Sequence, residues 1–312
     1  MNGKRVEQPV SRLPMRGSRP ATLADWLQLA EKLYAKQQLA LGQVATNAHD
    51  EALYLLLTVL GIPLESDARV LNKKLSAVQA EAVEEILRRR VMERVPAAYL
   101  TREAWLGGQR FYVDERVIIP RSYFVEIIDQ QLDGWLRAPE KVRRVVDVCT
   151  GSGCLAILLA QHFPKAKVDA VDLSTDALEV AKINVGAHGL SKRVKLWTSD
   201  VLDAVPVVKY DVILSNPPYE PSAHVDSQAP EFAAEPRMAH DGGNDGLEII
   251  RKLLRQARTR LTAEGIVMIE VGGLSGAMDR EFAVLEPHWL HTEDGANCVC
   301  VIHAARLAKW RG

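Results

Sequence analysis

The feature that most constrains the fold is a regular alternation of strand and helix patterns between residues 142 and 214. The apolar stretches with strand character are 142–148, 166–171, 194–197 and 210–214, and those with helical spacing are 155–163 and 175–188. Strands that alternate with helices pair in parallel, because each crossover helix returns the chain to the same end of the sheet. The pattern therefore predicts a mostly parallel sheet with helices on both faces.

The last third of the chain continues this pattern. A helix is predicted over 246–261 and a strand over 265–270, and two late β-like runs follow near 288–291 and 298–304. About seven strands result, which indicates an α/β fold with a doubly wound, Rossmann-like sheet.

The chain before this sheet has a different character, and its 312 residues exceed the usual size of one domain. Thr22 is a plausible N-cap for a first helix, a second is predicted over 48–60 and a third over 76–94. The predicted organisation is a flexible basic tail over 1–20, a helical substrate-recognition domain over 21–98, a hairpin connector over 99–119 around Gly107-Gly108, and the α/β domain over 120–312.

Composition limits the class of protein. Hydrophobic residues make up 47% and charged residues 25%, as in ordinary globular proteins. No apolar run reaches the roughly 20 residues that span a bilayer, so a cytoplasmic protein without membrane contact is expected. The four cysteines are too few and wrongly spaced for a disulfide framework or a metal site. A net charge of -1 argues against a protein whose whole surface binds nucleic acid, although a local basic patch stays open. No direct sequence-specific contact with nucleic acid is expected.

A glycine-rich turn follows the first predicted strand. The run 147–156 reads Asp-Val-Cys-Thr-Gly-Ser-Gly-Cys-Leu-Ala, which turns the chain sharply and opens a helix. Asp172 stands at the end of the second strand, where a carboxylate accepts hydrogen bonds from ribose hydroxyls in nucleotide-binding folds. The turn alone is ambiguous, because Gly151, Gly153 and Ala156 also satisfy the dinucleotide fingerprint.

The charge near this turn favours one of two possible cofactors, S-adenosylmethionine or NAD. Asp147, Asp172 and Asp200 all stand near the ends of successive strands and are expected at one edge of the sheet. This acidic setting repels a pyrophosphate and attracts a sulfonium cation with an amino group, so it favours S-adenosylmethionine over NAD.

The most informative motif follows the fourth strand. It is Asn216-Pro217-Pro218-Tyr219, in which two prolines fix the backbone and remove two N–H donors. The Asn216 side-chain oxygen and the nearby carbonyls then form rigid acceptors for the two protons of an NH2 group, and Tyr219 supplies an aromatic wall. The motif predicts methyl transfer to an amide or exocyclic nitrogen, with positioning as the main source of catalysis.

Two further segments accompany this motif. Glu235-Pro236 and the run 241–247 form an acidic loop before a helix, which either closes over the substrate or is an ordinary surface loop. Glu270, at the end of the fifth strand, is expected to shape the pocket rather than to react.

These motifs together resemble the glutamine N5-methyltransferases of the translation apparatus, over residues 21–312. The resemblance implies a class I S-adenosylmethionine methyltransferase fold and methylation of a glutamine amide in either release factors or the third protein of the large ribosomal subunit. The segment 119–124, Ile-Pro-Arg-Ser-Tyr-Phe, departs from the Arg-Pro-Glu-Thr-Glu of release-factor enzymes and is similar to the ribosomal-protein branch. The substrate is therefore expected to be that ribosomal protein, either free or within an assembling ribosome.

The resemblance also assigns roles to residues. Asn216, Pro217 and Tyr219 are the expected catalytic residues, and the same motif with Pro218 and Glu235 is expected to bind substrate. The expected cofactor-binding residues are Asp147, Cys149, Thr150, Gly151, Ser152, Gly153, Asp172, Asp200, Val201 and Asn216. Cys149 replaces a usual glycine, and Val201 stands where an aromatic residue often stacks on adenine.

Three other functions remain open at this stage. They are methylation of release factors, N6 methylation of adenine in a nucleic acid, and a cofactor-sensing assembly factor without activity. The second requires base flipping and a basic surface, for which the near-neutral charge gives no support.

Overall fold

The structure is a computed structural model that describes residues 13–14 and 18–310. The chain divides into two compact units. One contains Met1–Arg102 together with the short segment Ala229–Ala234, and the other contains Glu103–Gln228 and Glu235–Gly312. Most of the predicted basic tail, residues 1–12 and 15–17, lies outside the described residues.

The first unit is a bundle of helices, as the sequence predicted. Its elements are α1 (Leu23–Gln37), α2 (Ala48–Val59), η1 (Ala68–Asn72), α3 (Ala77–Met92), α4 (Ala97–Thr101) and, from the returning segment, α9 (Pro230–Ala233). Thr22 caps α1 through a capping box with Asp25, which confirms its predicted role. Buried apolar faces of α1, α2 and α3 form one core that includes Trp26 and Leu56.

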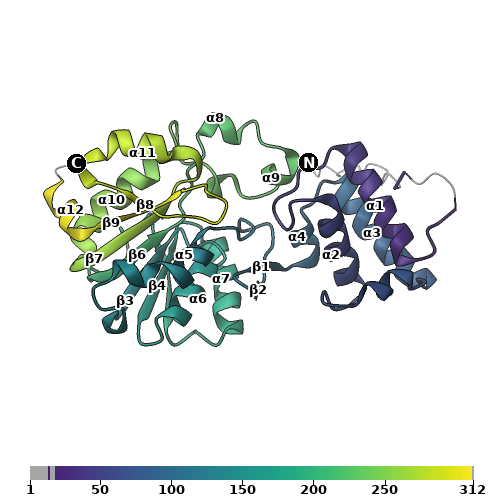
Figure 1. Ribbon diagram of the computed structural model, residues 1–312, viewed down its shortest axis with the longest axis horizontal. Coiled ribbons are helices and arrows are strands. Elements are labelled where there is room, and N and C mark those ends of the chain that lie inside the picture. The colour runs from purple at the N-terminus through teal and green to yellow at the C-terminus, as the bar shows by residue number, and fades with distance from the viewer. Residues whose placement is uncertain (1–12, 15–17, 311–312) are drawn as a thin grey trace, which may run out of the picture. The chain divides into compact units, whose positions relative to one another are not determined.

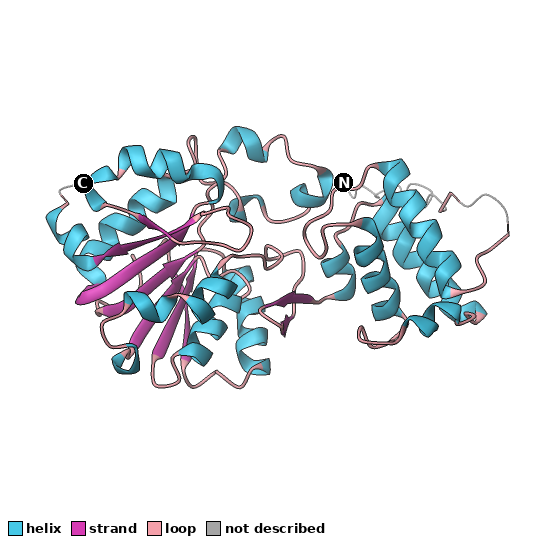
Figure 2. Ribbon diagram, viewed as in Figure 1, coloured by secondary structure: helices cyan, strands magenta, loops and turns pink. Residues whose placement is uncertain are grey.

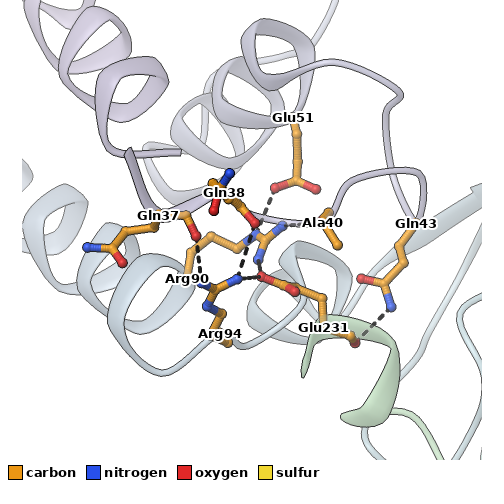
Figure 3. A network of polar contacts seen from close by, with 8 residues as sticks. All are labelled: Gln37, Gln38, Ala40, Gln43, Glu51, Arg90, Arg94 and Glu231. Carbon is orange, nitrogen blue, oxygen red and sulfur yellow. Dashed lines mark hydrogen bonds and ion pairs between the residues drawn. The ribbon is translucent and has the colours of Figure 1, made fainter. Parts of the chain in front are cut away.

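A buried polar network also crosses this unit (Figure 3). The side chain of Arg90 is 0% exposed, and its Nε donates to Glu51 Oε1 at 2.7 Å. Glu231, also 0% exposed, pairs with Arg94 through a 2.8 Å contact between Nη1 and Oε1. Gln43 Nε2 donates to the Glu231 carbonyl at 3.1 Å. The segment 229–234 is thus held within the helical unit by a charge-assisted hydrogen bond from Arg94 and a neutral one from Gln43.

The second unit begins with the predicted hairpin. Strands β1 (Ala104–Leu106) and β2 (Gln109–Phe111) pair antiparallel, with Leu106 opposite Gln109. Gly107 and Gly108 have φ values of +57° and +69°, the backbone geometry that a two-residue hairpin turn needs.

The main sheet of this unit has seven strands, as predicted (Figure 2). They are β3 (Arg144–Val148), β4 (Lys167–Asp172), β5 (Val194–Thr198), β6 (Tyr210–Ser215), β7 (Leu261–Glu270), β8 (His288–Trp289) and β9 (Val299–His303). Their order is β5-β4-β3-β6-β7-β9-β8, with β3 to β7 parallel and β8 and β9 antiparallel to their neighbours. After β3 the chain forms β4 and β5 on one side of this strand, and it then crosses back to form β6 on the other side of β3. A topological switch point therefore lies between β3 and β6, where such sheets bind ligands.

Helices cover both faces of the sheet (Figure 1). One face packs against α5 (Phe124–Gln130), α6 (Cys154–His162) and α7 (Thr175–Ala187), and the other against α10 (Glu248–Arg260), α11 (Ser275–Glu281) and α12 (Ala304–Lys309). Alternate residues of β3 enter the two cores, since Val145 belongs to the first and Val146 to the second. Burial on both faces explains the continuous apolar strands in the sequence.

Short elements account for the differences from the sequence prediction. The helices α5, α11 and α12 were not predicted, because six or seven residues give too little periodicity to recognise. The β-like run 298–304 is a strand only to His303, after which α12 begins. The other short helices of this unit are α8 (Ser222–Val225), η2 (Leu132–Trp135), η3 (Pro139–Lys141), η4 (Arg237–Ala239), η5 (Gly272–Leu274) and η6 (Ala283–Leu285).

Candidate active site

The glycine-rich turn after β3 has the tight geometry that the sequence predicted. Cys149, Gly151 and Gly153 have φ values of +64°, +53° and +80°. A Cβ on Gly153 would lie 3.1 Å from the Cβ of Ala181, so this glycine allows α6 and α7 to approach closely. Cys149 adopts the left-handed conformation despite its side chain, which stores strain at the switch point.

Asp147 lies beneath this turn and is fully buried. Its Oδ2 accepts a hydrogen bond from Thr150 Oγ1 at 2.6 Å, whereas Oδ1 has no hydrogen-bond partner among the described residues. Burial raises the pKa of Asp147 to about 7. A buried carboxylate oxygen without a donor is costly, so this atom suits a ligand that brings a donor or a positive charge.

Asp172 stands at the end of β4 and touches the same turn. Its Oδ2 accepts from the Gly151 N–H at 2.8 Å, and its Oδ1 accepts from the Ser174 N–H at 2.9 Å. Burial raises the pKa of Asp172, and these backbone hydrogen bonds act in the opposite direction. Each oxygen keeps a second lone pair, so the carboxylate can still accept hydroxyl protons.

The third predicted carboxylate lies after β5 in a different environment. Asp200 is exposed, and its Oδ2 pairs with Lys252 Nζ at 2.7 Å. Val201 is buried and has a φ of +55°, which is unusual for a β-branched residue. Both residues follow a strand that is parallel to β4, so they lie at the carboxyl edge of the sheet with Asp172.

The Asn216-Pro217-Pro218-Tyr219 motif follows β6, next to the glycine turn. Ser215 is paired with Val148 in the sheet, and its hydroxyl donates to the Val148 carbonyl at 2.7 Å. This bond holds the residue before the Asn-Pro-Pro-Tyr motif next to the residue before the glycine-rich turn. Asn216 then donates through Nδ2 to Glu270 Oε1 at 3.1 Å. No donor of the described residues reaches its Oδ1, which leaves this oxygen available to a ligand.

Three glycines form a cradle around Tyr219. A Cβ on Gly246 would lie 2.2 Å from the Tyr219 carbonyl oxygen, and one on Gly272 would lie 2.5 Å from Tyr219 Cε2. A Cβ on Gly242 would lie 2.8 Å from Tyr219 Cα. Burial raises the pKa of Tyr219, so its hydroxyl stays protonated at neutral pH. The ring position therefore depends on the absence of a side chain at Gly272, and the Tyr219 backbone depends on the absence of side chains at Gly242 and Gly246.

The acidic loop 241–247 is attached to the residue that follows the motif. Glu220 and Asp241 form an isolated parallel bridge, in which the Gly242 N–H donates to the Glu220 carbonyl at 2.9 Å. Ser222 Oγ donates to Asp241 Oδ1 at 2.6 Å. Whether the loop moves as a lid stays a prediction, but any movement has to break these bonds.

Glu235 is buried and bound entirely by protein groups. Arg121 donates to both of its carboxylate oxygens at 2.8 and 2.7 Å, and His240 Nε2 lies 2.8 Å from Oε2. Burial opposes ionisation of Glu235, but hydrogen bonds from Arg121 and His240 outweigh it and lower its pKa. The structure therefore places Glu235 as an anchor for the segment that contains Arg121.

The sequence places Glu270 at the pocket but does not show which residues it contacts. Glu270 accepts from Ser122 Oγ at 2.5 Å and from the Tyr123 N–H at 3.1 Å, in addition to Asn216. Ser122 and Arg121 belong to the segment that departs from the release-factor pattern. The sequence sets these residue types apart, but only the fold shows that Ser122 donates to Glu270 and that Arg121 donates to Glu235.

The described residues contain no group of His, Cys, Asp and Glu that could hold a metal ion. None of the helices in the described part is long and apolar enough to cross a membrane. All four cysteines are free.

The residues around the switch point fit S-adenosylmethionine. The partnerless Oδ1 of Asp147 suits its positive charges, and the carboxylate of Asp172 suits ribose hydroxyls. Gly153 is the N-cap of α6 and provides no side-chain cap, which leaves N–H donors for a carboxylate. The Methyltransferase small domain family matches residues 130–243, which include these groups. Fold and site together define a class I S-adenosylmethionine-dependent methyltransferase.

Similar proteins define the family more narrowly. The ribosomal protein uL3 glutamine methyltransferase of Burkholderia pseudomallei is 44% identical, over 93% of this chain and 97% of the relative. The enzyme of the same name from Bordetella pertussis is 43% identical over 92% and 96%, and that from Bradyrhizobium diazoefficiens is 40% identical over 92% of each chain. The chain belongs to the family of ribosomal protein uL3 glutamine methyltransferases.

Proposed function

We propose that the protein transfers a methyl group from S-adenosylmethionine to the side-chain amide nitrogen, N5, of a glutamine in ribosomal protein uL3. The observation that carries this proposal is the orientation of Asn216, whose amide oxygen is available while its nitrogen is held by Glu270. Similarity to the uL3 enzymes over nearly the whole chain supports the choice of substrate.

The chemistry required is the activation of a weak nucleophile. The lone pair of an amide nitrogen is delocalised into its carbonyl, and S-adenosylmethionine supplies an electrophilic methyl group when bound. Asn216 Oδ1 and the carbonyl near Pro217 would accept hydrogen bonds from the two N–H groups and hold the nitrogen for attack on that methyl group. The cofactor would leave as S-adenosylhomocysteine, and the methylated nitrogen would lose one proton to water. Positioning of this kind contributes on the order of 7 to 11 kcal/mol, so no strong general base is needed. The Tyr219 ring covers one face of the planar amide.

Residues along the carboxyl edge of the sheet are proposed to bind the different parts of the cofactor. The turn Cys149-Thr150-Gly151-Ser152-Gly153 lines the methionine part, and Asp147 balances its positive charge. Asp172 holds the ribose, while Asp200 and Val201 flank the adenine.

On the substrate side, Pro217 and Pro218 hold the backbone of the motif rigid. The substrate-binding role of Glu235 remains a prediction, and its fully paired carboxylate favours an indirect contribution through Arg121. The helical unit is proposed to recognise the body of uL3, either as a free protein or in an assembling ribosome. This substrate implies a cytoplasmic location. The proposed function requires no sequence-specific contact with nucleic acid.

The first experiment is incubation of the enzyme with S-adenosylmethionine bearing a labelled methyl group and a ribosomal extract that lacks the modification. Mass spectrometry then identifies every labelled molecule. We expect a single methyl group on one glutamine of uL3. Label in a release factor would retain the chemistry but refute the substrate, and label in nucleic acid would refute both.

A second test addresses Asn216. Asn216→Ala is expected to leave the Kd for S-adenosylmethionine within a few fold of wild type while abolishing turnover, because it removes the acceptor for the substrate amide. Calorimetry with the cofactor and single-turnover methylation of uL3 measure the two quantities. Unchanged turnover would show that the motif does not act through this side chain.

A further inference from the structure

Glu270 lies at the end of β7, where it is 3% exposed and cannot serve as an open binding surface. Three donors converge on its carboxylate. Asn216 Nδ2 donates to Oε1 at 3.1 Å, while Ser122 Oγ and the Tyr123 N–H donate to Oε2 at 2.5 and 3.1 Å. Two of these donors come from the segment before α5, so Glu270 connects that segment to the substrate motif.

This arrangement fixes which end of the Asn216 amide faces the ligand. An ionised carboxylate only accepts hydrogen bonds, so the group that contacts Glu270 has to be the NH2 end of Asn216. The carbonyl end then points away from Glu270 and accepts nothing from the described residues. A ligand at this position meets an acceptor and has to supply a donor.

The surroundings of Glu270 allow this ionised state at mildly alkaline pH. Burial raises the pKa of Glu270 to about 7. Hydrogen bonds from Ser122, Tyr123 and Asn216 and the charge of Arg121 act in the opposite direction. The nearby titratable groups Tyr123, Tyr219 and Cys298 have raised pKa values and stay neutral at pH 8. At that pH the carboxylate is ionised, and Arg121 is the nearby charge that favours it.

We propose that Glu270 is a positioning residue that determines substrate specificity. By holding Asn216 Nδ2 it presents Asn216 Oδ1 to the substrate, so that the site accepts the NH2 group of a glutamine and rejects the carboxylate of a glutamate. The inference rests on the proposed function, because it concerns the residue that this function methylates. A site built to hydrogen-bond an N–H group discriminates strongly against a group that lacks it.

Glu270→Gln tests the inference because it changes the hydrogen-bonding pattern without changing the shape. To satisfy Ser122 and Tyr123, the new amide has to turn its oxygen toward them and its NH2 group toward Asn216. Asn216 then rotates, and its NH2 group faces the substrate. The combination of Asn216→Asp with Glu270→Gln restores an acceptor, because the amide at 270 donates to the carboxylate at 216.

The experiment measures two dissociation constants at pH 8 for each enzyme variant, with the cofactor product S-adenosylhomocysteine present. One ligand is uL3 and the other is uL3 with its methylated glutamine replaced by glutamate. Wild type is expected to prefer the glutamine form, and Glu270→Gln is expected to reduce this preference by about tenfold or more. The double variant is expected to recover it. The matched control is Glu264→Gln, an exposed carboxylate on the same strand, which should leave the preference unchanged.

The outcomes separate this inference from the proposed function. If wild type methylates uL3 but Glu270→Gln keeps the full preference for glutamine, the role of Glu270 is refuted and the function stands. If wild type does not methylate uL3, the function itself is refuted. Affinity for S-adenosylmethionine reports whether each variant is folded. Should the single variant fail to fold, the double variant decides: a preference for glutamine supports the inference, and its loss overturns it.

Discussion

Arg90→Met is expected to destabilise the helical unit by about 3 to 5 kcal/mol, the usual cost of removing one partner of a buried ion pair. The side chains of Arg90 and Glu51 are 0% and 1% exposed. Methionine fills a similar volume but leaves the Glu51 carboxylate without its 2.7 Å partner and the Ala40 carbonyl without its 3.1 Å donor. Because typical domains unfold at 5 to 15 kcal/mol, this loss is a large fraction of the total.

The assay is native-state hydrogen exchange, read by mass spectrometry on peptides from α2 and α3. A loss of 3 to 5 kcal/mol corresponds to exchange that is faster by roughly two to three and a half powers of ten. The matched control is Arg89→Met on the same helix. Arg89 is 41% exposed and lies 3.7 Å from Glu93, so its removal should cost about 0 to 1 kcal/mol.

A third variant identifies the source of the loss. Arg90→Met combined with Glu51→Met removes the charges of this pair. It should regain most of the stability because Glu231, which lies 3.6 Å from Arg90 Nη1, keeps Arg94 as its partner, so that no unpaired buried charge remains. Equal exchange in the Arg90→Met and Arg89→Met variants would refute the reasoning. Failure of the double variant to recover would show that shape, rather than charge, controls this position.

Three other changes have defined outcomes. Gly272→Ala should lower turnover strongly by displacing Tyr219, whose ring would lie 2.5 Å from the new Cβ, whereas Gly273→Ala meets open space and should retain wild-type kcat. Asp147→Asn should flatten the dependence of stability on pH. Because the pKa of Asp147 is raised to about 7, wild type loses stability as the pH rises from about 4 to 7. Urea midpoints measured across this range should change less with pH in the variant. Cys149→Gly should raise the free energy of unfolding by roughly 0.5 to 1 kcal/mol, seen as a higher urea midpoint, because glycine adopts a φ of +64° without strain. An unchanged midpoint would exclude strain there.

The sequence by itself determined the architecture of the second unit. Alternating strands and helices over 142–214 specify a parallel sheet, because the period of apolar residues is a local property of the chain. It also predicted which residues gather at one edge of the sheet, since the carboxyl ends of parallel strands lie together. The glycine turn, Asp172 and Asn216 are indeed neighbours through the pairing of β3 with β4 and β6.

The tertiary structure alone decided which side chains support that edge. Glu270 contacts Ser122 and Asn216 across 148 and 54 residues of sequence, and Glu231 reaches Arg94 across 137. No local pattern predicts such pairs, because a carboxylate has the same appearance in the sequence whether it is exposed or buried. Burial and partner choice depend on which segments the fold brings together, and these two quantities set the charge of Glu270 and the orientation of Asn216.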